Sequence, residues 1–272
     1  MKIKKRSFSA KLKKMQEAYD GKLAELNKAR LAGWAFNTAQ KNYTAAIILA
    51  AGSSTRMGGG INKQLQPLCG VPVLAHTLLA YQKCPLIREI VVVTRPQDFE
   101  SVYEIAQQYG IKKLLHIVAG GNSRQESAVC GMRKLESHVR YVAIADGARC
   151  MTTPGQIAKV CLRAYRHHAA SAAHKINDTV KRTTSLGMTT ETVDRTNLWQ
   201  AQTPQIFHTS LYTAALYTAQ KDEFEGTDDN SLIEHLGYQV RMVECGHQNI
   251  KITTADDLPL AEAILHYRSK NK

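Results

Sequence analysis

A glycine- and serine-rich segment with two cations is the part of the chain best suited to chemistry. It reads AAGSSTRMGGGINKQ from Ala50 to Gln64 and directly follows an apolar run. Backbone N–H groups in such a loop can point at oxyanions, because no side chain intervenes. Arg56 and Lys63 add positive charge, which suits a triphosphate that must be neutralised before attack. The segment lacks a Walker A ending and GxGxxG spacing, so it predicts a phosphate site of another kind, with a solvated surface loop as the alternative.

Apolar runs along the chain predict the strands that would position this loop. They are Ala45–Ala50, Glu89–Thr94, Leu114–Val118 and Tyr141–Ala145, with further strands expected at Val240–Val243 and Ile250–Ile252. Helix-like stretches are Val73–Gln82, Phe99–Tyr109, Arg124–Glu136 and, near the end, Asp256–Tyr267. Alternation at this spacing indicates βαβ units. Continuous apolar runs are typical of parallel strands that are buried on both faces, so the sequence predicts an α/β fold with a mostly parallel sheet.

Two segments depart from this alternation. Residues 174–207 are polar and threonine-rich, with Gly187 near their middle, and they predict an extended excursion or β-arm. Residues 1–43 hold eleven basic and three acidic residues, most of the net charge of +13. Apolar residues recur there at helical spacing, so the alternatives are a solvated extension, a docked helix, a membrane-surface helix or a transit peptide. The predicted organisation is a basic extension over 1–43 and one domain over 44–272.

Composition excludes several classes of protein. The 272 residues are 44% hydrophobic and 22% charged, as in an ordinary globular protein. Six cysteines show no zinc-like spacing, and no apolar h-region follows the basic start. These features predict free thiols in a reducing compartment, hence a cytoplasmic protein without a membrane span. The mildly basic body suits anionic small molecules better than nucleic acid.

Further motifs follow the first loop in a fixed order. They are AGGNSRQES at 119–127, ADGAR at 145–149, DTVKR at 178–182, DRTNLWQAQTPQIF at 194–207, TDDNSL at 227–232 and NIKIT at 249–253. In this order the chain resembles the 2-C-methyl-D-erythritol 4-phosphate cytidylyltransferase family of the non-mevalonate isoprenoid pathway over 44–267. The resemblance implies a three-layer α/β/α Rossmann-like nucleotidyltransferase fold with a protruding β-arm, and a homodimer formed through that arm.

The resemblance also implies a reaction and a role for each matching residue. CMP would pass from CTP to 2-C-methyl-D-erythritol 4-phosphate, giving 4-diphosphocytidyl-2-C-methyl-D-erythritol and pyrophosphate, with Mg²⁺ or another divalent cation. The implied catalytic residues are Arg56, Lys63, Lys251 and Arg195. The implied nucleotide ligands are Ala50, Ala51, Gly52, Arg56, Lys63, Gly121, Asn122, Arg124, Ser127 and Asp146. The implied polyol-phosphate ligands are Asp146, Arg149, Thr179, Lys181 and Arg195, with Asp146 also near the metal.

Some residues depart from the family pattern, and several alternatives stay open. Ala145 replaces a histidine, Cys150 replaces a proline, and Asn62 replaces the proline before the loop lysine; none removes a charge from the proposed site. The nearest alternative is a cytidylyltransferase for another polyol phosphate, such as ribitol 5-phosphate. A nucleotidyltransferase that uses a different base, a regulatory nucleotide-binding protein and a nucleic-acid binder are the others. Asp228 and Asp229 suit a helix N-cap more simply than a second metal site.

Overall fold

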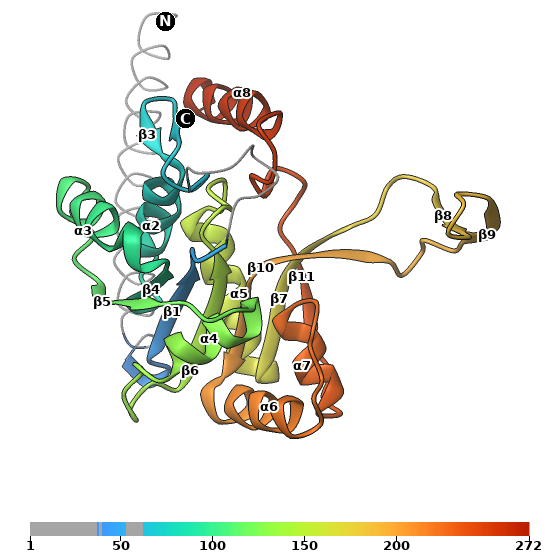
Figure 1. Cartoon of the computed structure of the whole chain (residues 1–272), viewed down its shortest axis with the longest axis horizontal. Helices are drawn as coiled ribbons and strands as arrows, with labels where there is room; N and C mark the ends of the chain where they lie inside the picture. Colours follow the sequence, from blue (N-terminus) through green and yellow to red (C-terminus); the bar gives the residue numbers. More distant parts are fainter. Residues whose placement is uncertain (1–36, 38–39, 53–61, 272) are drawn as a thin grey trace, which may run out of the picture. The chain divides into compact units, whose positions relative to one another are not determined.

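The computed structural model describes residues 37, 40–52 and 62–271. The chain divides into two compact units, Met1–Lys41 and Asn42–Lys272. The first unit lies almost wholly outside the described residues, as does the helix expected within 1–43. The second unit holds a large sheet, its helices and two small hairpins, and it positions every part of the site described below (Figure 1).

A seven-stranded sheet forms the centre of the second unit, in the order β11-β7-β10-β6-β1-β4-β5. Its strands are β1 (Thr44–Leu49), β4 (Ile87–Thr94), β5 (Leu114–Ala119), β6 (Tyr141–Asp146), β7 (Ala169–Lys175), β10 (Trp199–His208) and β11 (Arg241–Glu244). Strand β10 is antiparallel to both of its neighbours, whereas the other pairs are parallel. The prediction of an α/β fold with a mostly parallel sheet is confirmed.

Helices cover both faces of the sheet. They are α2 (Val73–Lys83), the 3₁₀ turn η2 (Pro96–Asp98), α3 (Phe99–Gln108), α4 (Arg124–Met132), α5 (Pro154–His167), α6 (Thr209–Lys221), α7 (Asp229–His235) and α8 (Asp257–Lys270). Alternate strand residues such as Ile47 and Ile144 pack with Tyr212 and Leu232, in a core shared with α4, α6 and α7. Helices α2 and α5 contact each other and pack on β4 and β7 respectively. Period-two alternation thus lets one strand bury side chains in two separate layers.

Three element predictions need correction. The helix expected to reach Glu136 ends at Met132, and turns follow it. The strand expected at Ile250–Ile252 is absent: within the described chain, that segment joins no ladder, although Ile252 N–H donates to the Ala148 carbonyl (2.9 Å). The excursion set at about 174–207 is shorter, because Trp199–His208 is β10 of the main sheet.

Buried glutamines explain why the sequence does not predict β10 as a strand of the main sheet. Gln202 and Gln205 are 3% and 1% exposed, so the strand lacks the apolar run that marks its neighbours. Gln205 Nε2 donates to Asp228 Oδ2 (2.6 Å), and its Oε1 accepts from the Asp229 backbone (2.9 Å). Such paired polar groups can be buried at little cost, but their partners lie far away along the chain.

A second, smaller core lies beside the sheet. Leu68, Val73, Met151 and Ile252 are buried there, and α8 covers them. The short hairpin of β2 (Pro67–Leu68) and β3 (Val71–Pro72) contributes to this core. Over the residues that the structure describes, no helix is long and apolar enough to cross a bilayer.

Candidate active site

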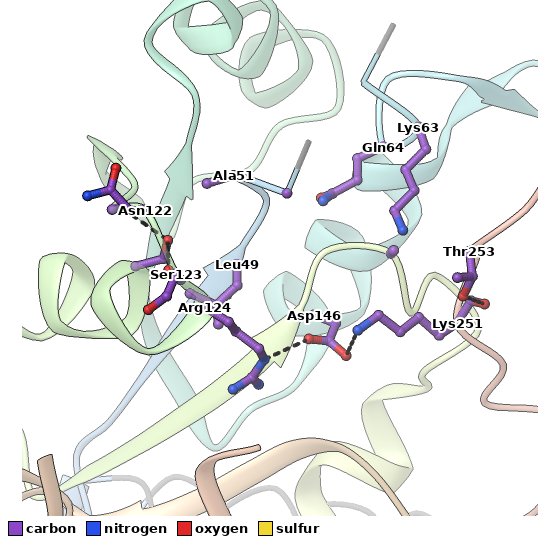
Figure 2. A pocket seen from close by; sticks show the side chains of 14 residues that line it. Leu49, Ala51, Lys63, Gln64, Asn122, Ser123, Arg124, Asp146, Lys251 and Thr253 are labelled. Atoms are coloured by element: carbon purple, nitrogen blue, oxygen red, sulfur yellow. Dashed lines mark hydrogen bonds and ion pairs between the residues drawn. The ribbon is translucent and has the colours of Figure 1, made fainter. Parts of the chain in front are cut away.

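A cavity of about 390 Å³ opens at the carboxyl ends of β1 and β6. Its lining comes from segments that are distant in sequence and adjacent in space (Figure 2). The lining residues are Leu49, Ala51, Gly52, Lys63, Gln64, Gly121, Asn122, Ser123, Arg124, Ser127, Asp146, Ala148, Lys251 and Thr253. Ligands of open α/β sheets bind at this edge, beyond the strand ends.

The loop after β5 and the first turn of α4 form one wall. A Cβ at Gly120 would lie 2.4 Å from the Ala51 Cβ, so only glycine allows the two loops to approach. Ser123 caps α4 by accepting from the Glu126 backbone N–H (3.1 Å). The Asn122 N–H donates to Glu126 Oε2 (2.7 Å), which holds the loop against the helix. A helix N-terminus carries partial positive charge, so this wall favours an anionic or polar ligand.

Asp146 lies at the centre of a group of cations. Lys251 Nζ is 3.0 Å from Asp146 Oδ2, Arg149 Nε is 3.4 Å from the same oxygen, and Arg124 Nε is 3.5 Å from Oδ1. Burial raises the pKa of Asp146, but Lys251, Arg124 and Arg149 outweigh burial and hold the pKa at about 2. The carboxylate is therefore ionised near neutral pH. The cavity lining holds three cationic side chains, Lys63, Arg124 and Lys251, and one carboxylate, so it is positively charged.

A buried acid behind the cavity holds Arg124. Asp229 is fully buried, and its Oδ2 is 2.7 Å from Arg124 Nη1. Its Oδ1 accepts a hydrogen bond from the Tyr212 hydroxyl (2.5 Å). Burial lowers the pKa of Arg124, and the charges of Asp229 and Asp146 more than offset this and raise it. Arg124 thus forms ion pairs both with Asp146 in the cavity and with Asp229 in the core.

Asn249 fixes the segment that presents Lys251. Its Nδ2 donates to Gln202 Oε1 (3.1 Å) and to the Thr203 carbonyl (3.0 Å), and its Oδ1 accepts from Thr152 Oγ1 (2.7 Å). Ile250 and Ile252 pack into the smaller core on either side of Lys251. The lysine between them faces the cavity, as Figure 2 shows.

Asn62 fixes the segment that presents Lys63. Its Nδ2 donates to Asp98 Oδ2 (2.9 Å), and Arg95 pairs with the same carboxylate (2.7 Å). Its Oδ1 accepts from the Gln64 N–H (3.1 Å). Asn62 stands where the sequence comparison expected a proline, and it supplies side-chain hydrogen bonds that proline lacks.

The structure brings most of the predicted site residues together. Those that line the cavity are Ala51, Gly52, Lys63, Gly121, Asn122, Arg124, Ser127, Asp146 and Lys251. Ala50 is buried beneath, with its N–H donated to the Val93 carbonyl (2.6 Å). Arg149 lies behind Asp146 and donates to the Asn249 carbonyl (2.8 Å). Arg56 lies outside the described residues.

The predicted arm residues do not reach the cavity of their own chain. Thr179, Lys181 and Arg195 lie in the exposed segment between β7 and β10, which carries the hairpin of β8 (Val180–Thr183) and β9 (Thr189–Val193). This hairpin projects away from the sheet (Figure 1). Lys181 Nζ donates to Thr192 Oγ1 (2.5 Å), and Arg195 donates to the Asn177 carbonyl.

Sequence reasoning missed several lining residues and one buried partner. Leu49, Gln64, Ser123, Ala148 and Thr253 line the cavity without having been proposed. Leu49 directly precedes the first quoted motif, and the other four lie inside quoted motifs, so the motifs themselves were the signal for them. Asp229 had no such signal, because TDD predicts a helix N-cap. Asp228 is indeed the N-cap of α7, and its neighbour is the buried partner of Arg124.

Known proteins match the chain over the unit that carries this cavity. The family model for 2-C-methyl-D-erythritol 4-phosphate cytidylyltransferase matches residues 44–267. The chain belongs to that family. A relative of that name from Halalkalibacterium halodurans is 42% identical over 81% of this chain and 96% of its own. Another from Syntrophus aciditrophicus is 43% identical over 83% of this chain and 97% of its own.

A solved structure supports the same assignment. The 4-diphosphocytidyl-2C-methyl-D-erythritol synthase from Anaerococcus prevotii superimposes with a TM-score of 0.73 at 30% identity, over 82% of this chain and 96% of that chain. Membership of the cytidylyltransferase family makes the chain an enzyme that uses CTP.

Proposed function

We propose that this chain transfers CMP from CTP to 2-C-methyl-D-erythritol 4-phosphate and releases pyrophosphate. The observation that carries the proposal is the pairing of Arg124 and Lys251 with Asp146, in a cavity that Lys63 also lines, at the strand ends of a chain that belongs to this family. Attack on a nucleotide phosphate needs charge neutralisation and positioning more than covalent help. The cavity supplies both, since buried carboxylates hold Arg124 and Lys251 in place.

The chemistry requires little proton transfer by the protein. An oxygen of the polyol phosphate attacks the α-phosphorus of CTP, and the bond to the bridging oxygen of the β-phosphate breaks. The attacking phosphate is already an anion, so no general base is needed. Lys63 and Lys251 stabilise the negative charge that develops around the α-phosphorus, and Arg56 adds to them as a prediction from the sequence. Asp146 orients Lys251 and Arg124 and accepts hydrogen bonds from substrate hydroxyl groups.

The base and ribose of the nucleotide are assigned to the wall formed by the loop after β5 and the first turn of α4. Gly121, Asn122 and Ser127 would surround the base and ribose, with Ala51 and Gly52 beside the phosphates. Ala50 supports this wall from beneath, because its N–H is already used. The N-terminus of α4 adds its partial positive charge to the same wall. Arg124, in the first turn of α4, connects this wall to Asp146.

A divalent cation fits the lining as a companion of the nucleotide. Among the described residues, no three His, Cys, Asp or Glu side chains form a metal cluster, and Asp146 is the one carboxylate that lines the cavity. Mg²⁺ is commonly held by one or two carboxylates together with substrate phosphates. Asp146, ionised because of its low pKa, would hold Mg²⁺ in this way. When bound, the cation would neutralise the departing pyrophosphate.

The arm residues are proposed to act on a second copy of the chain. Thr179, Lys181 and Arg195 are exposed and lie outside the cavity of their own chain. In a homodimer formed through the arm, they would bind the phosphate of the polyol substrate in the partner's cavity. Arg149 would act from beneath, by positioning Asp146.

Pyrophosphate release tests the proposal. The purified chain would receive CTP, Mg²⁺ and either 2-C-methyl-D-erythritol 4-phosphate or ribitol 5-phosphate. We expect release with the first substrate alone. Release with ribitol 5-phosphate alone would keep the chemistry and overturn the substrate, and CTP binding without release from either would indicate a regulatory nucleotide-binding protein. Sedimentation of the chain, with and without an arm shortened across β8 and β9, tests the homodimer.

A further inference from the structure

Gln64 lines the cavity, and its buried amide oxygen has no hydrogen-bond partner among the described residues. The residue is 3% exposed. It lines the cavity beside Lys63 and points inward in Figure 2. Buried polar atoms are nearly always paired, because an unpaired one loses its hydration without replacement. The missing partner of Gln64 is therefore to be sought in a ligand.

The backbone of Gln64 is held on both sides. Its N–H donates to Asn62 Oδ1 (3.1 Å), and its carbonyl accepts from the Leu74 N–H (2.8 Å). Asn62 is in turn fixed by Asp98 (2.9 Å). The carboxamide thus extends from a rigid point, as a group that recognises a substrate must.

The carboxamide lies close to the backbone that follows Asp146. A Cβ at Gly147 would lie 2.0 Å from Gln64 Oε1 and 3.2 Å from the Leu49 carbonyl oxygen. Any side chain at residue 147 would occupy the place that the carboxamide now holds. Glycine at this position therefore leaves room for a hydrogen-bond acceptor against the backbone next to Asp146.

We infer that Gln64 contacts substrate, and that its amide oxygen accepts a hydrogen bond from a substrate hydroxyl group. This inference rests on the proposed function. Phosphates of CTP carry no donor near neutral pH. The amino group of the base is assigned to the wall that holds Asn122, which lies across the cavity from Gln64 in Figure 2. The remaining donors are the hydroxyl groups of the polyol and of the ribose, because the ribose joins the base to the phosphates and can present a hydroxyl group to either side of the cavity. Gln64 then contributes to specificity through the hydroxyl that it recognises.

Gln64→Met tests the inference, since methionine keeps the size of the side chain and removes the acceptor. Gln66→Met is the matched control, because Gln66 lies two residues along and outside the cavity lining. We expect Gln64→Met to raise the KM of one substrate about tenfold, as for one lost hydrogen bond, with a smaller change in kcat. Gln66→Met should leave both KM values unchanged, and both variants should melt near the wild-type temperature.

Deoxy substrates identify the hydroxyl. If Gln64 binds the ribose, the kcat/KM of the wild-type enzyme should be about tenfold lower with 2′-deoxyCTP or 3′-deoxyCTP than with CTP. Gln64→Met should then have the same kcat/KM with that analogue as with CTP. If Gln64 binds the polyol, the same pattern should appear with a deoxy analogue of the polyol phosphate. Unchanged KM values in Gln64→Met, or a change in Mg²⁺ requirement alone, would overturn the inference.

Binding separates this inference from the proposed function. Titration calorimetry with CTP alone, and with polyol phosphate added to a non-reactive CTP analogue, needs no turnover. Weaker binding of one ligand to Gln64→Met would support the role of Gln64 even if the wild-type chain released no pyrophosphate. Equal binding of both ligands to wild-type and Gln64→Met would refute that role while leaving the transfer reaction in place.

Discussion

Two arginine–carboxylate ion pairs have nearly equal nitrogen–oxygen distances, but one carboxylate is buried and the other is exposed to solvent. Arg124 and Asp229 are 2.7 Å apart at the wall of the cavity, and the carboxylate is fully buried. Arg182 and Glu191 are 2.8 Å apart in the β8–β9 hairpin, with side chains 67% and 52% exposed. Removing one member of a buried pair leaves a charge without water, whereas solvent screens an exposed pair. Loss of one charged residue at the cavity should therefore destabilise the protein, whereas loss of one in the arm should have little effect on stability.

The same difference separates the remaining contacts of the two regions. The cavity walls depend on buried groups such as Asn249 and Asn62, each bonded to several distant segments. The arm depends on its own hairpin, where Lys181 and Thr192 pair across β8 and β9. Arm substitutions should therefore change binding without changing stability, and cavity substitutions should often change both.

The largest effect is expected from Lys251→Ala. Loss of this cation should lower kcat about 10² to 10³-fold, in line with the removal of one charge-stabilising group from a transition state. Lys63→Ala should behave similarly. Lys221→Ala is the matched control, because Lys221 is in the last turn of α6 and outside the cavity lining. Steady-state pyrophosphate release gives kcat, and circular dichroism checks the fold. Normal kcat in both lysine variants would disprove the site assignment.

Asp229→Asn should show how strongly the cavity depends on its core. The variant leaves Arg124 without its buried counter-charge, and unfolding free energy should fall by about 3 kcal/mol. Glu191→Gln removes the corresponding acid of the arm and should cost less than about 1 kcal/mol. Urea denaturation measures both values. Equal losses in the two variants would refute the contrast between the regions.

Acid should reduce the contribution of Asp146 to stability. Because the pKa of Asp146 is about 2 in the folded chain and near 3.8 when unperturbed, its ionised form stabilises the fold at pH values above about 4. That contribution, about 2 kcal/mol, is lost as the pH falls from about 4 towards 2. The stability difference between wild type and Asp146→Asn should accordingly narrow over this range in urea titrations. A difference that stays constant with pH would contradict the charge cluster.

The smallest effect is expected in the arm. Arg195→Ala should raise the KM for the polyol phosphate roughly tenfold, since one charge-assisted hydrogen bond is lost. The KM for CTP and the melting temperature should stay close to wild type. Arg182→Ala is a control from the same arm, in β8, with no assigned substrate contact. A large loss of stability in Arg195→Ala would show that the arm is a structural element of its own chain.

Short-range features of this protein could be read from the sequence. The runs at Ala45–Ala50 and Tyr141–Ala145 are apolar because their strands are buried on both faces, and the structure places β1 and β6 there. The motifs around Lys63, Asp146 and Lys251 identified the family and most of the cavity lining. Each of these signals lies within a few consecutive residues, where periodicity and residue type are informative.

Other features depend on contacts between distant segments. The burial of β10 requires Gln205 to find Asp228 and the start of α7. Arg124 pairs with Asp229, and the Gln64 amide oxygen lies over Gly147 with no partner in the described part of the chain. Both arrangements require distant segments to meet at one edge of the sheet. By itself, the sequence therefore determined the fold class, the family and the motifs of the site. Only the tertiary structure decided which polar groups are buried, paired or left for substrate, because that depends on which distant segments pack together.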